Sequence, residues 1–67
     1  MPSSGTALEK AWLFHEIGRC HLELNEFDLA KDYGQKSFTQ AVEAHDAVWQ
    51  LNAKILIAQT EGKLLSE

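Results

Sequence analysis

Residues 14–41 read FHEIGRCHLELNEFDLAKDYGQKSFTQA, and this stretch decides the fold. Small residues recur at Gly18, Ala30 and Ser37, where two helices would have to approach each other closely. Large apolar residues fall between them at helical spacing: Phe14, Ile17, Leu24, Phe27 and Phe38. The combination predicts two helices joined by a short turn, a unit that stacks on copies of itself and offers a surface to partners. It favours a binding or scaffolding protein over a self-contained enzyme.

The first helix is predicted to begin at Thr6, which has the spacing of a capping box with Glu9. Two neighbouring apolar stripes then follow the helix. One stripe holds Leu13, Ile17, Cys20 and Leu24, and the other holds Phe14, Gly18 and His21. Two adjacent apolar stripes indicate a helix that is buried on more than one side.

The first turn is expected at Asn25 and Glu26, because asparagine tolerates the left-handed conformation that often ends a helix. The second helix is predicted from Phe27 to about Glu43. Its apolar stripe consists of Phe27, Ala30, Gly34, Ser37, Phe38 and Ala41. A glycine within a helix costs about 1 kcal/mol relative to alanine, so Gly34 is expected to weaken this helix.

The second turn is expected at His45 and Asp46, with Asp46 as the N-cap of a third helix that frays after Gly62. That helix is apolar on two stripes: Val48, Leu51, Ile55 and Ala58 on one, and Trp49, Ala53, Leu56 and Thr60 on the other. No fourth helix follows to cover its outer side. That side is therefore expected to be wet or covered by another chain, so the fragment is expected to self-associate through exposed apolar helix faces.

The predicted fold class is all-α, with three antiparallel helices that make about one and a half helix-turn-helix repeats. Residues 1–5 are expected to be a disordered leader or residues added for expression. Residues 6–43 are expected to form one repeat, and residues 44–67 the first helix of the next. Ordering 67 residues costs on the order of 100 kcal/mol. The chain is therefore expected to be a marginally stable piece of a longer array.

The composition argues against several classes of function. The net charge is -4, and six Lys and Arg residues are scattered among ten acidic ones, so the electrostatic footprint of nucleic-acid binding is missing. No run of about 18 apolar residues is present to span a membrane. Cys20 is the only cysteine, which rules out an intramolecular disulfide and favours an intracellular location.

The residues that carry chemistry predict neither catalysis nor a metal or cofactor. The only soft-metal candidates are His15, Cys20, His21 and His45, and adjacent helical residues such as Cys20 and His21 point about 100° apart. Cys20 is expected to be an inert core thiol, and His21 a partly buried packing histidine with one hydrogen-bond partner. Ser37 lies at a packing position, and no sequence signal indicates a pocket that would activate a carboxylate.

These positions resemble the tetratricopeptide repeat, which implies an α-solenoid that binds other proteins. The matching positions are Phe14, Ile17, Gly18, His21, Asn25, Glu26, Phe27, Ala30, Gly34 and Ser37. His21 and Gly34 depart from the motif, since large aromatic residues are usual there, and Val42 stands near the place of the proline that often ends the unit. Ala58 is similar in position to Gly18, which makes the repeat forty residues long, as in the extended variant of the motif.

A closer resemblance lies in the strings AWLFHEIGRC (residues 11–20), LEL (22–24), WQLNA (49–53) and AQ (58–59). They are similar to the tetratricopeptide-repeat scaffolds of motile cilia that help attach outer dynein arms to doublet microtubules. The resemblance runs from about Thr6 to Leu64. It implies a non-enzymatic scaffold of the cytoplasm and ciliary axoneme, with docking-complex or dynein-arm subunits as partners.

Repeats of this kind usually bind peptides with the inward face of each first helix. The residues that would face this groove are Trp12, His15, Arg19, Leu22 and Glu23. Trp12 has an alternative role, packing against a preceding repeat, and Trp49 is expected to pack on the second helix or its neighbour.

A second function remains open, a cytosolic peptide-binding adaptor or cochaperone module. Chaperone-binding repeats hold a C-terminal carboxylate with Lys and Asn side chains. His15, Arg19 and Leu56 occupy the matching positions here, which disfavours that clamp but still allows an acidic segment to bind.

Overall fold

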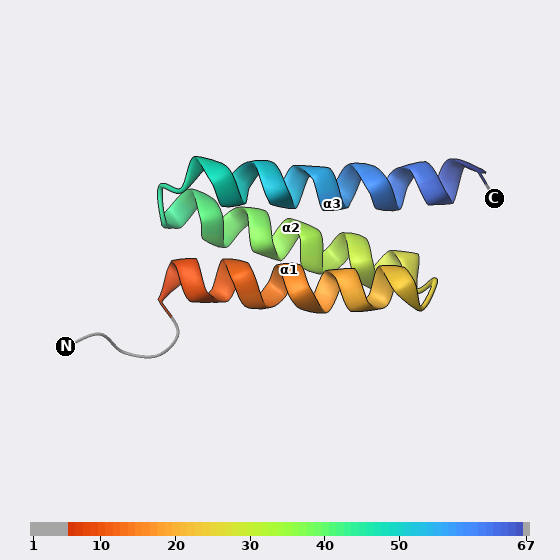
Figure 1. Ribbon diagram of the computed structural model, residues 1–67, viewed down its shortest axis with the longest axis horizontal. Helices are drawn as coiled ribbons and strands as arrows, with labels where there is room; N and C mark the ends of the chain where they lie inside the picture. Colours follow the sequence, from red (N-terminus) through yellow and green to blue (C-terminus); the bar gives the residue numbers. More distant parts are fainter. Residues whose placement is uncertain (1–5, 67) are drawn as a thin grey trace.

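Three packed antiparallel helices make up the structure, a computed structural model that describes residues 6–66 (Figure 1). They are α1 (Ala7–Glu23), α2 (Phe27–Glu43) and α3 (Ala47–Ser66). α2 packs along both other helices, and α1 also contacts α3. The predicted all-α fold of the tetratricopeptide type is confirmed. The leader predicted for residues 1–5 lies outside the described residues.

Local sequence signals fix where α1 and α3 begin. The Glu9 amide donates to Thr6 Oγ1 at 3.2 Å, and the Thr6 amide donates to Glu9 Oε1 at 3.1 Å, which completes the predicted capping box. Asp46 Oδ1 accepts from the Trp49 amide at 2.9 Å, so the predicted cap of α3 is also confirmed.

Both turns close in the same way. Asn25 and His45 adopt positive φ angles of 63° and 54°, as residues that end a helix in the left-handed conformation do. At the first turn the Glu26 amide donates to the His21 carbonyl at 2.8 Å, and at the second the Asp46 amide donates to the Ala41 carbonyl at 3.1 Å. These six-to-one hydrogen bonds define a Schellman motif. The two predicted helix breaks are therefore confirmed.

The repetition of the turns gives the chain a regular period. The three helices begin at Ala7, Phe27 and Ala47, so each helix with its turn occupies the same length of chain. The caps Thr6 and Asp46 lie two such units apart, as Gly18 and Ala58 do. This regular spacing supports the forty-residue repeat.

Small residues fill the interfaces between the helices. The buried residues of α2 are Ala30, Gly34, Ser37 and Ala41, which confirms its predicted stripe. Ser37 is fully buried, and its Oγ donates to the Ala11 carbonyl of α1 at 2.7 Å. The small side chains thus let the helices approach closely, while the one hydroxyl on this stripe finds a partner.

The two buried glycines make room for α3. A Cβ added at Gly18 would lie 2.8 Å from Leu56 Cδ2, and one added at Gly34 would lie 2.8 Å from Ile57 Cγ1. Contacts this short are not tolerated without a shift of the neighbouring atoms. Gly34 therefore has a packing role that its helix-weakening effect did not indicate: it lets α3 approach α2.

One predicted stripe is not part of the core. Cys20 is exposed, and so are Leu13 (48%) and Leu24 (66%), so the prediction of a buried core thiol was wrong. The reason is geometric, because α2 and α3 cover only one side of α1. That side holds the stripe of Phe14 and Gly18, whereas Cys20 lies on the uncovered side.

The third helix also differs from prediction at its end. It continues past Gly62 to Ser66 instead of fraying. As predicted, Ala53, Leu56 and Thr60 form its packed stripe and are buried. The outer stripe is exposed: 65% of Val48 and 58% of Leu51 remain accessible.

Replacing Gly18 with alanine is expected to lower the free energy of unfolding by about 1 kcal/mol, measured by urea denaturation. Overpacking against Leu56 and the Ala30 carbonyl lowers the free energy of unfolding by about 1–3 kcal/mol. The better helix propensity of alanine offsets about 1 kcal/mol of this loss. Gly62→Ala is the matched control. A Cβ there meets no atom within 4 Å, so this variant is expected to gain about 1 kcal/mol. Equal effects of the two substitutions would contradict the close packing at Gly18.

Candidate protein-binding groove

A groove lies between α1 and α3. Two of its lining residues, His15 and Arg19, come from α1, and the rest come from α3: Asn52, Ile55, Leu56 and Gln59. The packing of α3 against Gly18 brings the two helices together here. The groove therefore combines an apolar floor with polar and cationic groups at its sides.

The five residues predicted to bind partners lie on one side of α1, because Trp12, His15, Arg19 and Leu22 recur at steps of three and four and Glu23 lies one turn after Arg19. His15 and Arg19 line the groove, while Trp12, Leu22 and Glu23 lie beside it on the same helix. Trp12 is 52% exposed and Leu22 is half-buried. The prediction that these residues bind a partner is taken up again below as a proposal.

His15 is a largely enclosed polar group of the groove. Only 14% of its side chain is exposed, and its ring meets the Trp49 ring edge-on with the centroids 5.3 Å apart. Its Nδ1 has no hydrogen-bond partner, and Glu16 Oε2 lies 3.6 Å away, beyond hydrogen-bond distance. A buried nitrogen without a hydrogen-bond partner costs free energy, so His15 is expected to lower the stability of the fold. Trp49 therefore packs against α1, a neighbour of α2. The sequence predicted that Trp49 packs either on the second helix or on a neighbour of that helix.

The charged side chains beside the groove, Arg19 and Glu23, are exposed and form only a long ion pair. Arg19 Nη2 lies 3.8 Å from Glu23 Oε2, one turn further along α1, and 57% of the arginine side chain is accessible. An exposed pair of this kind contributes little to stability. Arg19 is therefore available to meet a carboxylate on a partner.

Sequence reasoning missed the residues that α3 contributes. Asn52, Ile55 and Gln59 stand forty positions after Trp12, His15 and Arg19, so they occupy the same places in the repeat. The forty-residue correspondence between Gly18 and Ala58 was the signal that pointed to them. Of the α3 residues that line the groove, only Leu56 was predicted at a binding position.

The groove was searched for side chains that could bind a metal ion. Within residues 6–66, no group of three or more His, Cys, Asp or Glu side chains is placed to hold a metal ion. His21 Nδ1 donates to Glu26 Oε1 at 2.7 Å, and its ring stacks on Tyr33, which confirms its predicted packing role. None of the described helices is long and apolar enough to cross a membrane.

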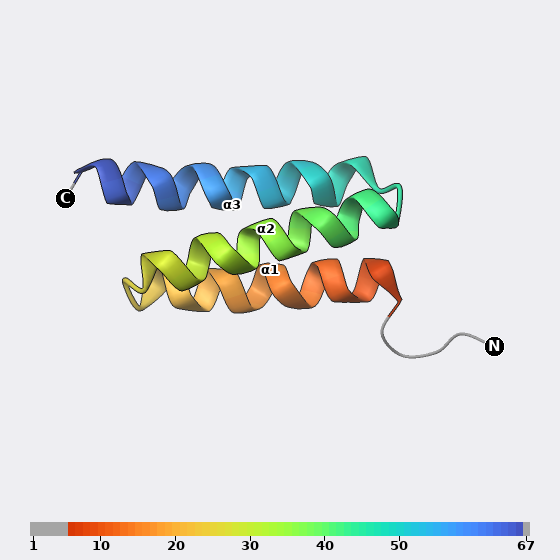
Figure 2. The same ribbon diagram turned by 180° about the vertical axis from the view of Figure 1, so that it is seen from behind.

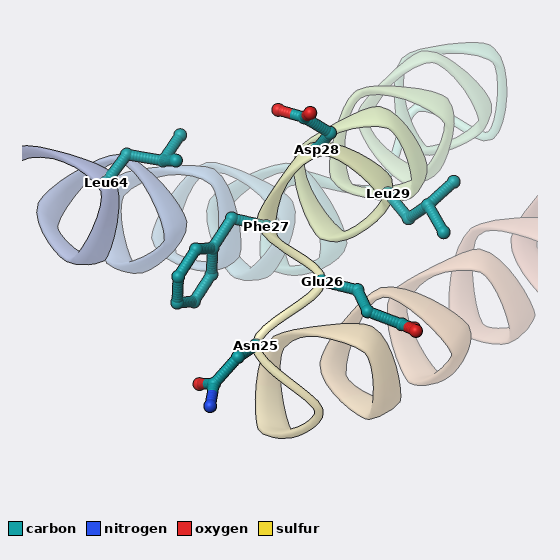
Figure 3. A pocket seen from close by; sticks show the side chains of 6 residues that line it. All are labelled: Asn25, Glu26, Phe27, Asp28, Leu29 and Leu64. Carbon is teal, nitrogen blue, oxygen red and sulfur yellow. The ribbon is translucent and has the colours of Figure 1, made fainter. Parts of the chain in front are cut away.

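A second hollow lies at the turn between α1 and α2, next to the end of α3 (Figure 3). Its lining residues are Asn25, Glu26, Phe27, Asp28, Leu29 and Leu64. Figure 3 shows their side chains pointing in different directions: Phe27 and Asn25 to one side of the turn, Glu26 and Leu29 to the other. Glu26 is already paired with His21. Because its polar groups do not converge, this hollow is a weaker candidate than the groove.

Comparison with known proteins shows a relation along nearly the whole chain. The chain is 55% identical over 64 residues, 96% of its length, to outer dynein arm-docking complex subunit 4 of Xenopus laevis. The same identity and coverage are found for the proteins of that name from Danio rerio and Homo sapiens. The chain is similar to a segment of these docking-complex subunits. It spans only 12%, 13% and 10% of their respective lengths.

This relation confirms the closer of the two resemblances drawn from the sequence, that to proteins of outer dynein arm docking. No protein-family model matches the chain, and no solved structure matches it. The likeness to tetratricopeptide repeats is therefore carried by the motif residues and by the helix packing described above.

Replacing His15 with phenylalanine is expected to raise the free energy of unfolding by about 1 kcal/mol. The variant keeps an aromatic ring against Trp49 and removes a buried nitrogen that has no partner. Urea denaturation measures the change, and His15→Ala serves as the control that loses the ring contact and is expected to be destabilised. A loss of stability in both variants would mean that the imidazole nitrogen is satisfied in solution.

Proposed function

We propose that the chain is a non-catalytic protein-interaction segment of a scaffold that helps attach outer dynein arms to the doublet microtubules of motile cilia. The observation that carries this proposal is the 55% identity over 96% of the chain to docking-complex subunits. The partners are other subunits of the docking complex or of the dynein arm. The protein acts in the cytoplasm and in the ciliary axoneme.

The groove between α1 and α3 supplies the contact surface in this proposal. Trp12 and Arg19 act as an anchor pair, since an exposed aromatic residue and an arginine are the residues that dominate many interfaces. His15, Leu22 and Glu23 complete the surface on α1. Residues 6–43 act as one repeat and residues 44–67 as the first helix of the next, so the groove forms where two repeats adjoin.

A cytosolic peptide-binding adaptor is the alternative function. It is favoured by the accessible Arg19 at the side of the groove, whose guanidinium suits a carboxylate of a short acidic segment. This alternative and the docking scaffold use the same groove, and they differ in the partner that is retained.

Affinity capture from an extract of ciliated cells tests the proposal. A longer natural chain that contains this segment is compared with a Trp12→Ala/Arg19→Glu version, and the retained proteins are identified by mass spectrometry. We expect docking-complex subunits to be retained and to be reduced about tenfold or more in the variant, because removing an interface anchor costs above about 1.4 kcal/mol.

The matched control is Lys10→Glu, which makes the same charge change on an exposed residue of α1 that does not line the groove. It is expected to retain the partners. If chaperones or proteins with acidic C-terminal segments are retained instead, the adaptor is the correct function. Equal retention of partners by the parent chain and the groove variant would show that Trp12 and Arg19 do not belong to the contact surface.

A further inference from the structure

The side of the groove that α3 forms carries two carboxamides and an isoleucine, and no charged group. Asn52, Ile55 and Gln59 line this side, with Leu56 at the base. Asn52 is half-buried and Gln59 is exposed, and within residues 6–66 neither carboxamide has a hydrogen-bond partner. The N–H groups of both carboxamides are therefore free to donate to a bound molecule.

The two carboxamides have different neighbours across the groove. α1 and α3 run in the same direction, with their first residues at the same end of the molecule (Figures 1 and 2). Positions forty residues apart are equivalent in the repeat, so Asn52 stands level with Trp12, and Gln59 stands level with Arg19. One end of the groove therefore offers an exposed indole beside a carboxamide, and the other end offers an exposed guanidinium beside a carboxamide.

The spacing of the carboxamides suits a chain in the polyproline II conformation. Gln59 comes seven positions after Asn52, which places both on the same side of α3, about 10.5 Å apart along its axis. Polyproline II has three residues per turn and rises about 3.1 Å per residue, so groups three residues apart face the same side at about 9.3 Å. In a β-strand, groups on one side recur at about 6.7 Å or 13 Å, which fits less well.

The carboxamides also discriminate against a bound helix. A helix pairs its own backbone N–H and C=O groups, whereas a polyproline II segment has no internal hydrogen bonds. Its carbonyls are therefore open to donors from a partner, even where the residues are prolines.

We propose that the groove binds a partner segment in the polyproline II conformation, and that Asn52 and Gln59 donate to two of its carbonyls three residues apart. A proline or another apolar residue of the segment packs on Trp12, as in aromatic-lined grooves that bind such segments. An aspartate or glutamate three positions away pairs with Arg19. The inference rests on the proposed function, because it names the occupant of the same groove.

NMR titration of the 67-residue chain with synthetic peptides tests the spacing. The peptides are runs of proline with one leucine and one glutamate, either three residues apart or two residues apart, and each spacing is made in both orders. We expect a peptide with the three-residue spacing to bind about tenfold more tightly than those with the two-residue spacing, because only its two side chains face Trp12 and Arg19 together. Equal binding at both spacings, or no binding of any peptide, would overturn the proposal. Tighter binding of an alanine-rich helical peptide would do the same.

The double variant Asn52→Leu/Gln59→Met tests the carboxamides. It keeps the approximate size of both side chains and adds no charge, but it removes both hydrogen bonds. We expect the Kd of the best-binding peptide to rise about tenfold. Gln35→Met is the matched control, since it removes an exposed carboxamide of α2 that does not line the groove, and it is expected to leave the Kd unchanged. Circular dichroism checks that both variants stay helical, and an unchanged Kd in the double variant would exclude the carboxamides from binding.

Affinity capture with the same double variant separates this inference from the proposed function. We expect it to lose the partners that the Trp12→Ala/Arg19→Glu version loses. If Asn52→Leu/Gln59→Met retains them while the other version does not, the groove remains the contact surface and the polyproline II mode is overturned. If the peptides bind as expected but no docking-complex subunit is captured, the proposed function fails and the binding mode stands.

Discussion

One leucine holds the three helices together by filling space that two glycines leave open. Leu56 is the only large apolar side chain that is fully buried among the described residues, at 1% exposed. A Cβ added to Gly18 would lie 2.8 Å from Leu56 Cδ2, and a Cβ added to Gly34 would lie 3.6 Å from the same atom. Because neither glycine carries a Cβ, a single side chain from α3 reaches the backbones of both α1 and α2. This contact sets how closely α3 packs against the pair of α1 and α2.

The same contact determines where the chain can meet other proteins. By holding α3 beside α1 it brings His15 against Trp49 and forms the groove, with Leu56 at its base. It also turns the opposite side of α3 outward. Ile55 lines the groove and is 46% exposed, so it lies at the edge between the groove and the outer side of α3.

Features set by neighbouring residues could be predicted from the sequence, and features set by distant ones could not. The cap at Thr6 and the turn at Asn25 depend on a few adjacent groups, and both were predicted correctly. Cys20 was placed in the core because periodicity reveals an apolar stripe but not whether a neighbour covers it. Gly34 was read as a weakness, since the approach of Ile57 is not visible in local sequence. Gln59 was missed because the repeat relation was not extended to the groove.

The equal spacing of the two turns constrains how such a chain can change in length. Each helix ends in a left-handed residue, Asn25 or His45, and the next begins at a fixed distance beyond it. Inserting one residue within α2 would rotate everything after it by about 100° about the helix axis. Leu56 would then miss the glycines, and the polar side of α3 would turn inward. An insertion or deletion of a whole helix pair preserves this phase, so a chain built this way accommodates a change in the number of repeats more easily than the gain or loss of one residue within a helix.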